Sequence, residues 1–245
     1  MTKIDIFSGF LGAGKSTLIK KLIKEAYAGE KVVLIENEFG EIGIDGGFLQ
    51  DAGIQITEMN SGCICCSLVG DFAKALKKVS EEYHPDRIVI EPSGVGKLSD
   101  VIKAVAGANL ENAELNSFCT VVDAGKCKLY MKNFGEFFDD QVESAGCIVL
   151  SHTDGISEEK LATCVSMLRQ HNPSAVLVTA SWNSLTGKDI LAAMEQKDSL
   201  RAEMERLRKE FEEEEAHGGH EHHHHHHDHD DDDDGECSSS PRPRR

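Results

Sequence analysis

The sequence predicts an α/β fold with a mainly parallel central sheet. Short apolar runs alternate with helix-like segments over the first 180 residues, the order that parallel strands with crossover helices produce. A glycine-rich segment, residues 8–17, separates the first apolar run from the first helical pattern. The length of 245 residues suits one such domain with an appendage. We therefore expect a domain over 1–185, a C-terminal helix over 186–216 and a disordered tail over 217–245.

The elements follow from local patterns taken in order. Residues 15–26 repeat apolar side chains on one helical face, as do residues 68–79 and 98–106. Ser157 is a plausible N-cap for a further helix, and Thr186 with Asp189 predicts a capping box at the start of the last one. Strands are expected at 4–7, 31–36, 54–59, 87–91, 117–122, 146–150 and 175–179.

The glycine-rich segment has the spacing of a phosphate-binding P-loop. Gly9 and the Gly14-Lys15-Ser16 triplet are separated by four residues, between a strand and a helix. Backbone N–H groups of such a turn surround phosphate oxygens at the positive end of the helix. Lys15 would pair with the β- and γ-phosphates, and Ser16 would hold Mg²⁺. The segment predicts nucleoside triphosphate binding by Gly12, Ala13, Gly14, Lys15, Ser16 and Thr17.

Three cysteines stand close together at Cys63, Cys65 and Cys66. Thiolates in a tight loop bind soft or borderline metals such as Zn²⁺ or Cu(I), and three thiols leave a tetrahedral ion one ligand short. The sequence favours a metal site that can release its ion, with disulfide exchange as the alternative. The other cysteines stand singly, and four of them lie in apolar surroundings where core packing is expected, namely Cys119, Cys127, Cys147 and Cys164.

Acidic residues follow two of the expected strands. Residues 36–45 carry four carboxylates, of which Glu38, Glu41 and Asp45 are candidates to position a water. Glu91 ends the strand at 87–91 and precedes a Pro-Ser-Gly turn. A carboxylate at the tip of a buried strand is suited to hold Mg²⁺ or its waters. We therefore expect Lys15, Ser16 and Glu91 to form the catalytic set, with Ser16 and Glu91 as the Mg²⁺ ligands.

The C-terminal segment differs from the body in charge. Residues 210–245 hold 13 acidic residues against three arginines, a net charge of −10 out of −17 for the chain, together with nine of the 12 histidines. The body shows no basic stripe, which argues against nucleic acid. We interpret the histidine run as native rather than as an expression tag. His222, His223 and His224 then belong to a weak metal-binding tail, with solubilising disorder as the alternative.

Compartment and partners follow from absences in the sequence. No apolar run approaches the length of roughly 20 residues that crosses a membrane, and no signal peptide precedes the first strand. We therefore expect a cytoplasmic protein without a membrane partner, in which disulfides are not expected.

Four motifs in order carry a family resemblance. They are residues 9–17, residues 36–45, the Gly62-Cys63-Ile64-Cys65-Cys66 stretch and the Glu91-Pro92-Ser93-Gly94 turn. Together they resemble the CobW family of metal-handling P-loop GTPases, related to the nickel-insertion GTPases HypB and UreG, over residues 4 to about 180. The resemblance implies a three-layer P-loop NTPase fold, GTP and Mg²⁺ as cofactors, and delivery of Zn²⁺, or of Co²⁺ or Ni²⁺, to a client metalloprotein. It leaves a homodimer open.

Two departures from that family bear on specificity. The guanine-recognition motif, usually Asn-Lys-x-Asp, corresponds here to Ser151-His152-Thr153-Asp154. Asp154 can still accept hydrogen bonds from guanine, so GTP remains the expected nucleotide. The C-terminal domain that many members carry is replaced by a helix and the low-complexity tail.

Two rival functions use the same residues differently. A His-rich metal storage or buffering protein with a vestigial nucleotide site would bind many ions without any effect of nucleotide. A P-loop kinase of small molecules would transfer phosphate to an acceptor and would have no use for the Cys-x-Cys-Cys loop. The sequence favours the GTP-hydrolysing metallochaperone.

Overall fold

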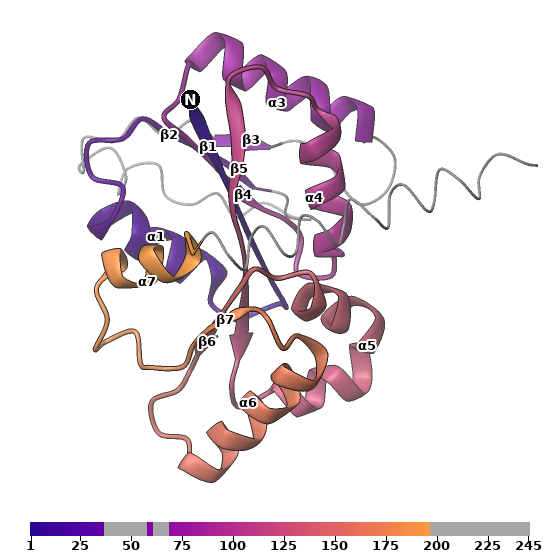
Figure 1. The fold of residues 1–245 in the computed structure, drawn as a ribbon, viewed down its shortest axis with the longest axis vertical. Helices are drawn as coiled ribbons and strands as arrows, with labels where there is room; N and C mark the ends of the chain where they lie inside the picture. The colour runs from indigo at the N-terminus through magenta and orange to yellow at the C-terminus, as the bar shows by residue number, and fades with distance from the viewer. Residues whose placement is uncertain (37–57, 61–68, 197–245) are drawn as a thin grey trace, which may run out of the picture. The chain divides into compact units, whose positions relative to one another are not determined.

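A computed structural model describes residues 1–36, 58–60 and 69–196 of the chain (Figure 1). Its centre is one sheet of seven strands in the order β3-β2-β4-β1-β5-β6-β7, and every pair of neighbours is parallel. The strands are β1 Thr2–Gly9, β2 Val32–Glu36, β3 Glu58–Asn60, β4 Arg87–Glu91, β5 Ala113–Asp123, β6 Cys147–Ser151 and β7 Val176–Val178. The predicted α/β fold with a mainly parallel sheet is confirmed.

Helices cover both faces of the sheet. Side chains of α3, α4, α5 and α6 pack on one face, and those of α1 and α7 pack on the other. Figure 1 shows α1 and α7 side by side. The helices are α1 Lys15–Glu25, α3 Val69–Tyr83, α4 Leu98–Gly107, α5 Cys127–Glu143, α6 Glu158–His171 and α7 Gly187–Met194. The described residues thus form the expected three layers.

Successive residues of a strand belong alternately to the two hydrophobic cores, one on each face of the sheet. In β4, Ile88 and Ile90 join the core under α3–α6, while Val89 joins the core under α1 and α7. The same alternation holds in β2 for Val33 and Leu34. Because neighbouring residues in a strand point to opposite faces, a strand covered on both sides must be apolar throughout. This requirement explains the continuous apolar runs in the sequence.

Two predicted helix starts are confirmed. The Ser157 hydroxyl accepts a hydrogen bond from the Lys160 amide at the start of α6. At α7, the Thr186 hydroxyl accepts from the Asp189 amide and the Asp189 carboxylate accepts from the Thr186 amide. These hydrogen bonds satisfy amides that the first helical turn leaves without partners.

Helix α5 is an element that the sequence reading missed. Residues 123–145 were given no helix, yet α5 runs over Cys127–Glu143. Phe134 has non-helical angles, φ −137° and ψ 30°, so the segment contains a kink. Its exposed side carries the apolar residues Leu129 and Phe137 and its buried side carries Gln141, so the sequence shows no clean apolar stripe here.

The four single cysteines of the described region are buried and free, which confirms the prediction of core packing. Cys119 and Cys147 are register partners on β5 and β6. A hydrogen bond with the Cys147 thiol and burial together raise the pKa of the Cys119 thiol. A buried thiol with a raised pKa is unreactive, so Cys119 serves as a small apolar side chain. The described region also contains no helix long and apolar enough to span a membrane.

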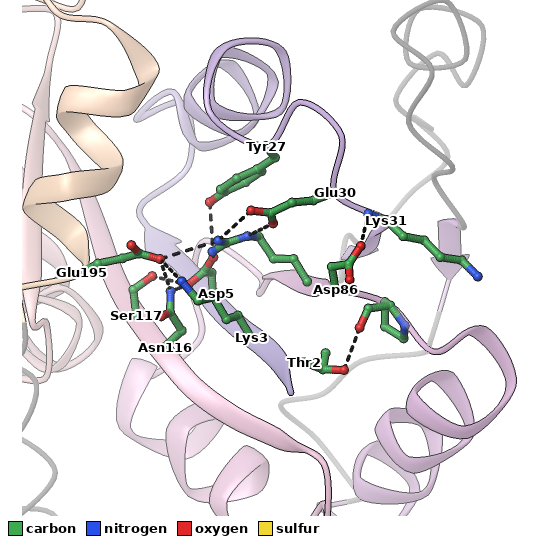
Figure 2. Close-up of polar contacts among 12 residues, drawn as sticks. Thr2, Lys3, Asp5, Tyr27, Glu30, Lys31, Asp86, Asn116, Ser117 and Glu195 are labelled. Atoms are coloured by element: carbon green, nitrogen blue, oxygen red, sulfur yellow. Dashed lines mark hydrogen bonds and ion pairs between the residues drawn. The ribbon is translucent and has the colours of Figure 1, made fainter.

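A buried ion cluster ties the amino-terminal end of the sheet together (Figure 2). The Arg87 guanidinium pairs with Asp5 on β1 and with Glu30 in the loop before β2, and it lies over the Tyr27 ring at 4.3 Å. Arg87 Nη2 is also 3.6 Å from Glu195 Oε1, just after α7. Four segments of the chain therefore meet at one cation.

Candidate nucleotide-binding site

The loop between β1 and α1 has the backbone of a phosphate-binding turn. Gly9, Gly12 and Gly14 have φ values of 139°, 70° and 99°, which glycine adopts without strain. Gly14 is the N-cap of α1 and has no side chain to cap the helix. The first amides of α1 are therefore left for an external anion, at the end where the helix dipole is positive.

Gly9 is required by close packing as well as by its φ angle. A Cβ on this residue would lie 2.4 Å from the Val121 carbonyl oxygen on β5. We expect Gly9→Ala to lower the free energy of unfolding by about 3 kcal/mol, because the β1 end must move away from β5. Urea denaturation measures this loss. Gly29→Ala is the matched control, since Gly29 also has a positive φ but a Cβ on it would meet no atom within 4 Å. Equal losses in both variants would contradict the packing argument.

Lys15, Ser16 and Glu91 come together at this loop. The Lys15 ammonium donates to the Gly9 carbonyl oxygen at 3.0 Å and lies 3.9 Å from Glu91 Oε1. The Ser16 hydroxyl donates to the Glu91 carboxylate, with Oγ 3.1 Å from Oε1 and 3.3 Å from Oε2. Lys15 and Glu91 are nearly fully buried, so the charges compensate one another where water is scarce. The structure thus brings the three predicted catalytic residues to one place.

The donor set also fits the Mg²⁺ ion that a nucleotide would bring. A serine hydroxyl and a carboxylate are hard oxygen ligands, which Mg²⁺ prefers over nitrogen and sulfur. In β4, Glu91 is the last residue, and its register partner on β2 is Glu36. Glu36 and Glu91 are therefore the last residues of adjacent parallel strands, at the same end of the sheet as the P-loop, which follows β1.

The loop after β4 rests on the P-loop. A Cβ on Gly94 would lie 2.9 Å from both the backbone nitrogen and Cδ2 of Leu11. The Gln141 amide, fully buried on α5, donates to the Gly94 and Gly96 carbonyls at 3.2 and 2.8 Å. Sequence reasoning missed Gln141 because it missed α5. The contact means that movement of one loop must displace the other.

In the predicted base-recognition segment after β6, Asp154 accepts a hydrogen bond from a residue that the sequence did not indicate. Asp154 is exposed, and its Oδ2 accepts a hydrogen bond from Asn183 Nδ2 at 3.0 Å. His152 has φ 54°, and its Nδ1 lies 3.0 Å from Ser151 Oγ and 3.5 Å from Asp123 Oδ2. Asn183 was not among the predicted site residues, since nothing in the local sequence links it to Asp154.

Several predicted residues lie outside the described ranges. They are the metal-loop cysteines Cys63, Cys65 and Cys66, the water-positioning candidates Glu38, Glu41 and Asp45, and the tail histidines His222, His223 and His224. Among described residues no group of three or more His, Cys, Asp or Glu side chains is arranged to hold a metal ion. Their roles stay predictions.

The P-loop backbone, the buried lysine and the strand-end carboxylate define a nucleotide-binding protein of the P-loop class. Residues 3–179 match the family described as CobW/HypB/UreG, nucleotide-binding domain, and the chain belongs to that family.

Curated relatives of the chain are named as zinc chaperones. This chain is 32% identical over 185 residues to the zinc chaperone CobW of a Sinorhizobium species, and the match covers 64% of this chain and 52% of the relative. It is 32% identical over 178 residues to the zinc chaperone YjiA of Escherichia coli, covering 69% and 55%. The chain therefore spans about half the length of these relatives.

Solved structures agree with the fold. The Zn(II)-bound YjiA GTPase from E. coli matches with a TM-score of 0.54 at 24% identity, over 72% of this chain and 56% of that one. The hydrogenase maturation factor HypB from Archaeoglobus fulgidus matches with a TM-score of 0.54 at 18% identity, over 82% and 89%. At these identities the likeness concerns the fold.

Proposed function

We propose that the protein is a GTP-hydrolysing metallochaperone that binds Zn²⁺ at Cys63, Cys65 and Cys66 and delivers it to a client protein. Family membership and the zinc chaperones among its relatives support this proposal. The observation that carries it is a row of strand ends. Glu91, Glu36 and Asn60 are register partners across β4, β2 and β3, and Cys63 follows Asn60 by three residues. β3, which precedes the proposed metal ligands in the sequence, thus ends beside the strands whose last residues are Glu36 and Glu91.

In the nucleotide site, Lys15 would exchange the Gly9 carbonyl for phosphate oxygens. Backbone amides at Gly12 to Thr17 would hold the remaining oxygens, and Ser16 with Glu91 would hold Mg²⁺, which when bound neutralises charge on the phosphates. Water then attacks the γ-phosphorus and the bond to the β-phosphate oxygen breaks, giving GDP and inorganic phosphate. The proton of the attacking water leaves with the phosphate product.

Loss of the γ-phosphate would change the position of the loop after β4, because Gly94 of this loop packs on Leu11 of the P-loop. Movement of this loop would change the environment at the neighbouring strand ends, after which the segment with the three cysteines follows in the sequence. Metal affinity would then differ between the GTP and GDP states, and linkage requires that Zn²⁺ change the affinity for GTP by the same factor.

The rival function is a metal buffer whose histidine tail binds ions regardless of nucleotide. A zinc titration against a chromogenic chelator distinguishes the two. It uses a chain ending at Glu210, with Mg²⁺·GTP, with Mg²⁺·GDP and without nucleotide. We expect one tight site whose affinity shifts at least fivefold between GTP and GDP and which Cys65→Ser removes.

Lys15→Ala is the matched control for that titration. It should keep the zinc site but lose the nucleotide-dependent shift, because the lysine is expected to bind the phosphates and is not a zinc ligand. If the unsubstituted chain ending at Glu210 binds zinc regardless of nucleotide, or does not bind it, the buffer is favoured, and the tail histidines of the full chain would then be the main ligands.

A further inference from the structure

Two loops and the end of a strand meet at Gly14, the residue before Lys15. A Cβ on Gly14 would lie 3.3 Å from Cη2 and 3.6 Å from Cζ3 of Trp182, and 3.8 Å from the Ser151 Cβ. Trp182 comes from the segment between β7 and α7, and Ser151 ends β6. The indole ring therefore lies against the P-loop, next to the segment that contains Asp154.

His152 does not fill the space beside the P-loop where the base is expected. In the motif that the sequence resembles, this position is a lysine, which has a long aliphatic stem. His152 is shorter, and its Nδ1 lies 3.5 Å from the Asp123 carboxylate at the end of β5. A ring held beside Asp123 does not supply a long apolar surface next to the P-loop. The apolar surface that the structure does place there belongs to Trp182.

Trp182 is anchored but not fully covered. The residue is half-buried and packs against the core cluster that contains α1 and α7. Its Nε1 is buried and has no hydrogen-bond partner among the described residues. A buried indole usually satisfies its N–H, so the lack of a partner is a cost that the fold bears to keep an aromatic side chain here.

The neighbouring residue, Asn183, holds the base-recognition carboxylate. Its side chain donates to Asp154 Oδ2, and its backbone amide donates to the Ser181 hydroxyl at 3.2 Å. Ser184 donates to the Ser181 carbonyl through its amide and its hydroxyl. The turn over residues 181–184 is thus closed by its own hydrogen bonds and presents Trp182 and Asn183 together.

We propose that Trp182 is the surface on which the nucleotide base stacks, and that Asn183 orients the Asp154 carboxylate toward guanine. This inference rests on the proposed function, the binding of GTP. Stacking on an aromatic ring is strong but does not distinguish one base from another. The carboxylate accepts from the N1–H and amino group of guanine, which adenine cannot match. Trp182 therefore sets affinity for purine nucleotides, and Asn183 sets the preference for guanine.

The test uses the full chain, in which Trp182 is the single tryptophan. Its fluorescence is followed while Mg²⁺ is added together with GDP, ADP or inorganic tripolyphosphate. Calorimetry measures the affinities of the variants that have no tryptophan. We expect GDP and ADP to change the emission. Trp182→Leu should weaken both nucleotides by about tenfold to a hundredfold and leave tripolyphosphate within twofold. Trp182→Phe should retain most of the affinity.

Each alternative gives a different pattern. If Trp182→Leu weakens tripolyphosphate as much as GDP, the residue only supports the P-loop and the stacking proposal is wrong. Unchanged affinity for GDP in this variant overturns it as well. If the unsubstituted protein binds none of the three ligands, the proposed nucleotide function itself fails.

Asn183→Ala tests the second half of the proposal. We expect the preference for GDP over ADP to fall at least fivefold while the affinity for ADP stays unchanged. Ser184→Ala is the control for the turn itself: it removes the hydroxyl bond to the Ser181 carbonyl, keeps the amide bond, and does not alter a contact of Asp154 in the described structure. An unchanged GDP-to-ADP ratio in Asn183→Ala would show that the hydrogen bond to Asp154 has no part in recognition.

Discussion

Lys15→Ala is expected to reduce GTP hydrolysis at least a thousandfold and to weaken Mg²⁺·GTP binding at least a hundredfold. The Lys15 ammonium is the buried cation of the P-loop, 3.0 Å from the Gly9 carbonyl and 3.9 Å from Glu91. Phosphate oxygens that develop charge in the transition state would lose this compensation at a site with little water. Phosphate release under single-turnover conditions measures hydrolysis, and calorimetry measures binding.

Lys21→Ala is the control for this experiment. Lys21 lies on the same helix and pairs with Glu25 at 3.0 Å, but it does not belong to the P-loop. Its loss should leave hydrolysis within twofold. Hydrolysis by Lys15→Ala at more than a tenth of the normal rate would show that the buried lysine is not the phosphate-binding group.

Arg87→Met is expected to lower the free energy of unfolding by about 3–5 kcal/mol. Methionine retains the apolar stem but removes the charge, so Asp5 is left as a fully buried carboxylate without its cation. Hydrogen bonds from Asn116 and Ser117 to Asp5 remain and would lessen the cost. Burial opposes the charge of Arg87, but the carboxylates of Glu30 and Asp5 outweigh it and raise the pKa of the guanidinium.

Urea denaturation at neutral pH measures this loss, with Lys77→Met as the control. Lys77 pairs with Glu81 on an exposed helix face at 3.9 Å, and such pairs contribute at most about 1 kcal/mol. The double variant Asp5→Asn with Arg87→Met should recover part of the stability, because no unpaired charge then remains buried. A loss below about 1 kcal/mol for Arg87→Met would contradict the view that the cluster holds the amino-terminal edge together.

Local signals in the sequence were enough for much of this fold. The apolar run at 87–91 matches β4 residue for residue, and Ser157 and Thr186 mark their helices because a capping side chain acts within three residues. The P-loop was predictable for the same reason, since its glycines and Lys15 all lie within residues 9–15. These features depend on neighbours along the chain, which a sequence displays directly.

The missing parts depend on contacts between distant residues. Trp182 meets Gly14 across 168 positions of sequence, and Gln141 reaches Gly94 across 47. Neither residue has a local pattern that marks it as part of a site. Helix α5 is not marked by a clean apolar stripe, because apolar Leu129 and Phe137 are exposed and polar Gln141 is buried. Pairings of this kind appear only when the sheet order is known.

The fixed register of β2 bears on the timescale at which the proposed nucleotide and metal sites can influence each other. This strand lies between β4 and β3, and its core residues Val33 and Leu34 are buried in opposite layers. A slip by one residue would exchange those layers, which both cores forbid. The spacing between Glu91 and Asn60 is therefore constant for the whole lifetime of the folded molecule. A signal between nucleotide and metal must then travel through the segments that leave the strands, on the microsecond-to-millisecond scale of loop and hinge motion rather than that of unfolding.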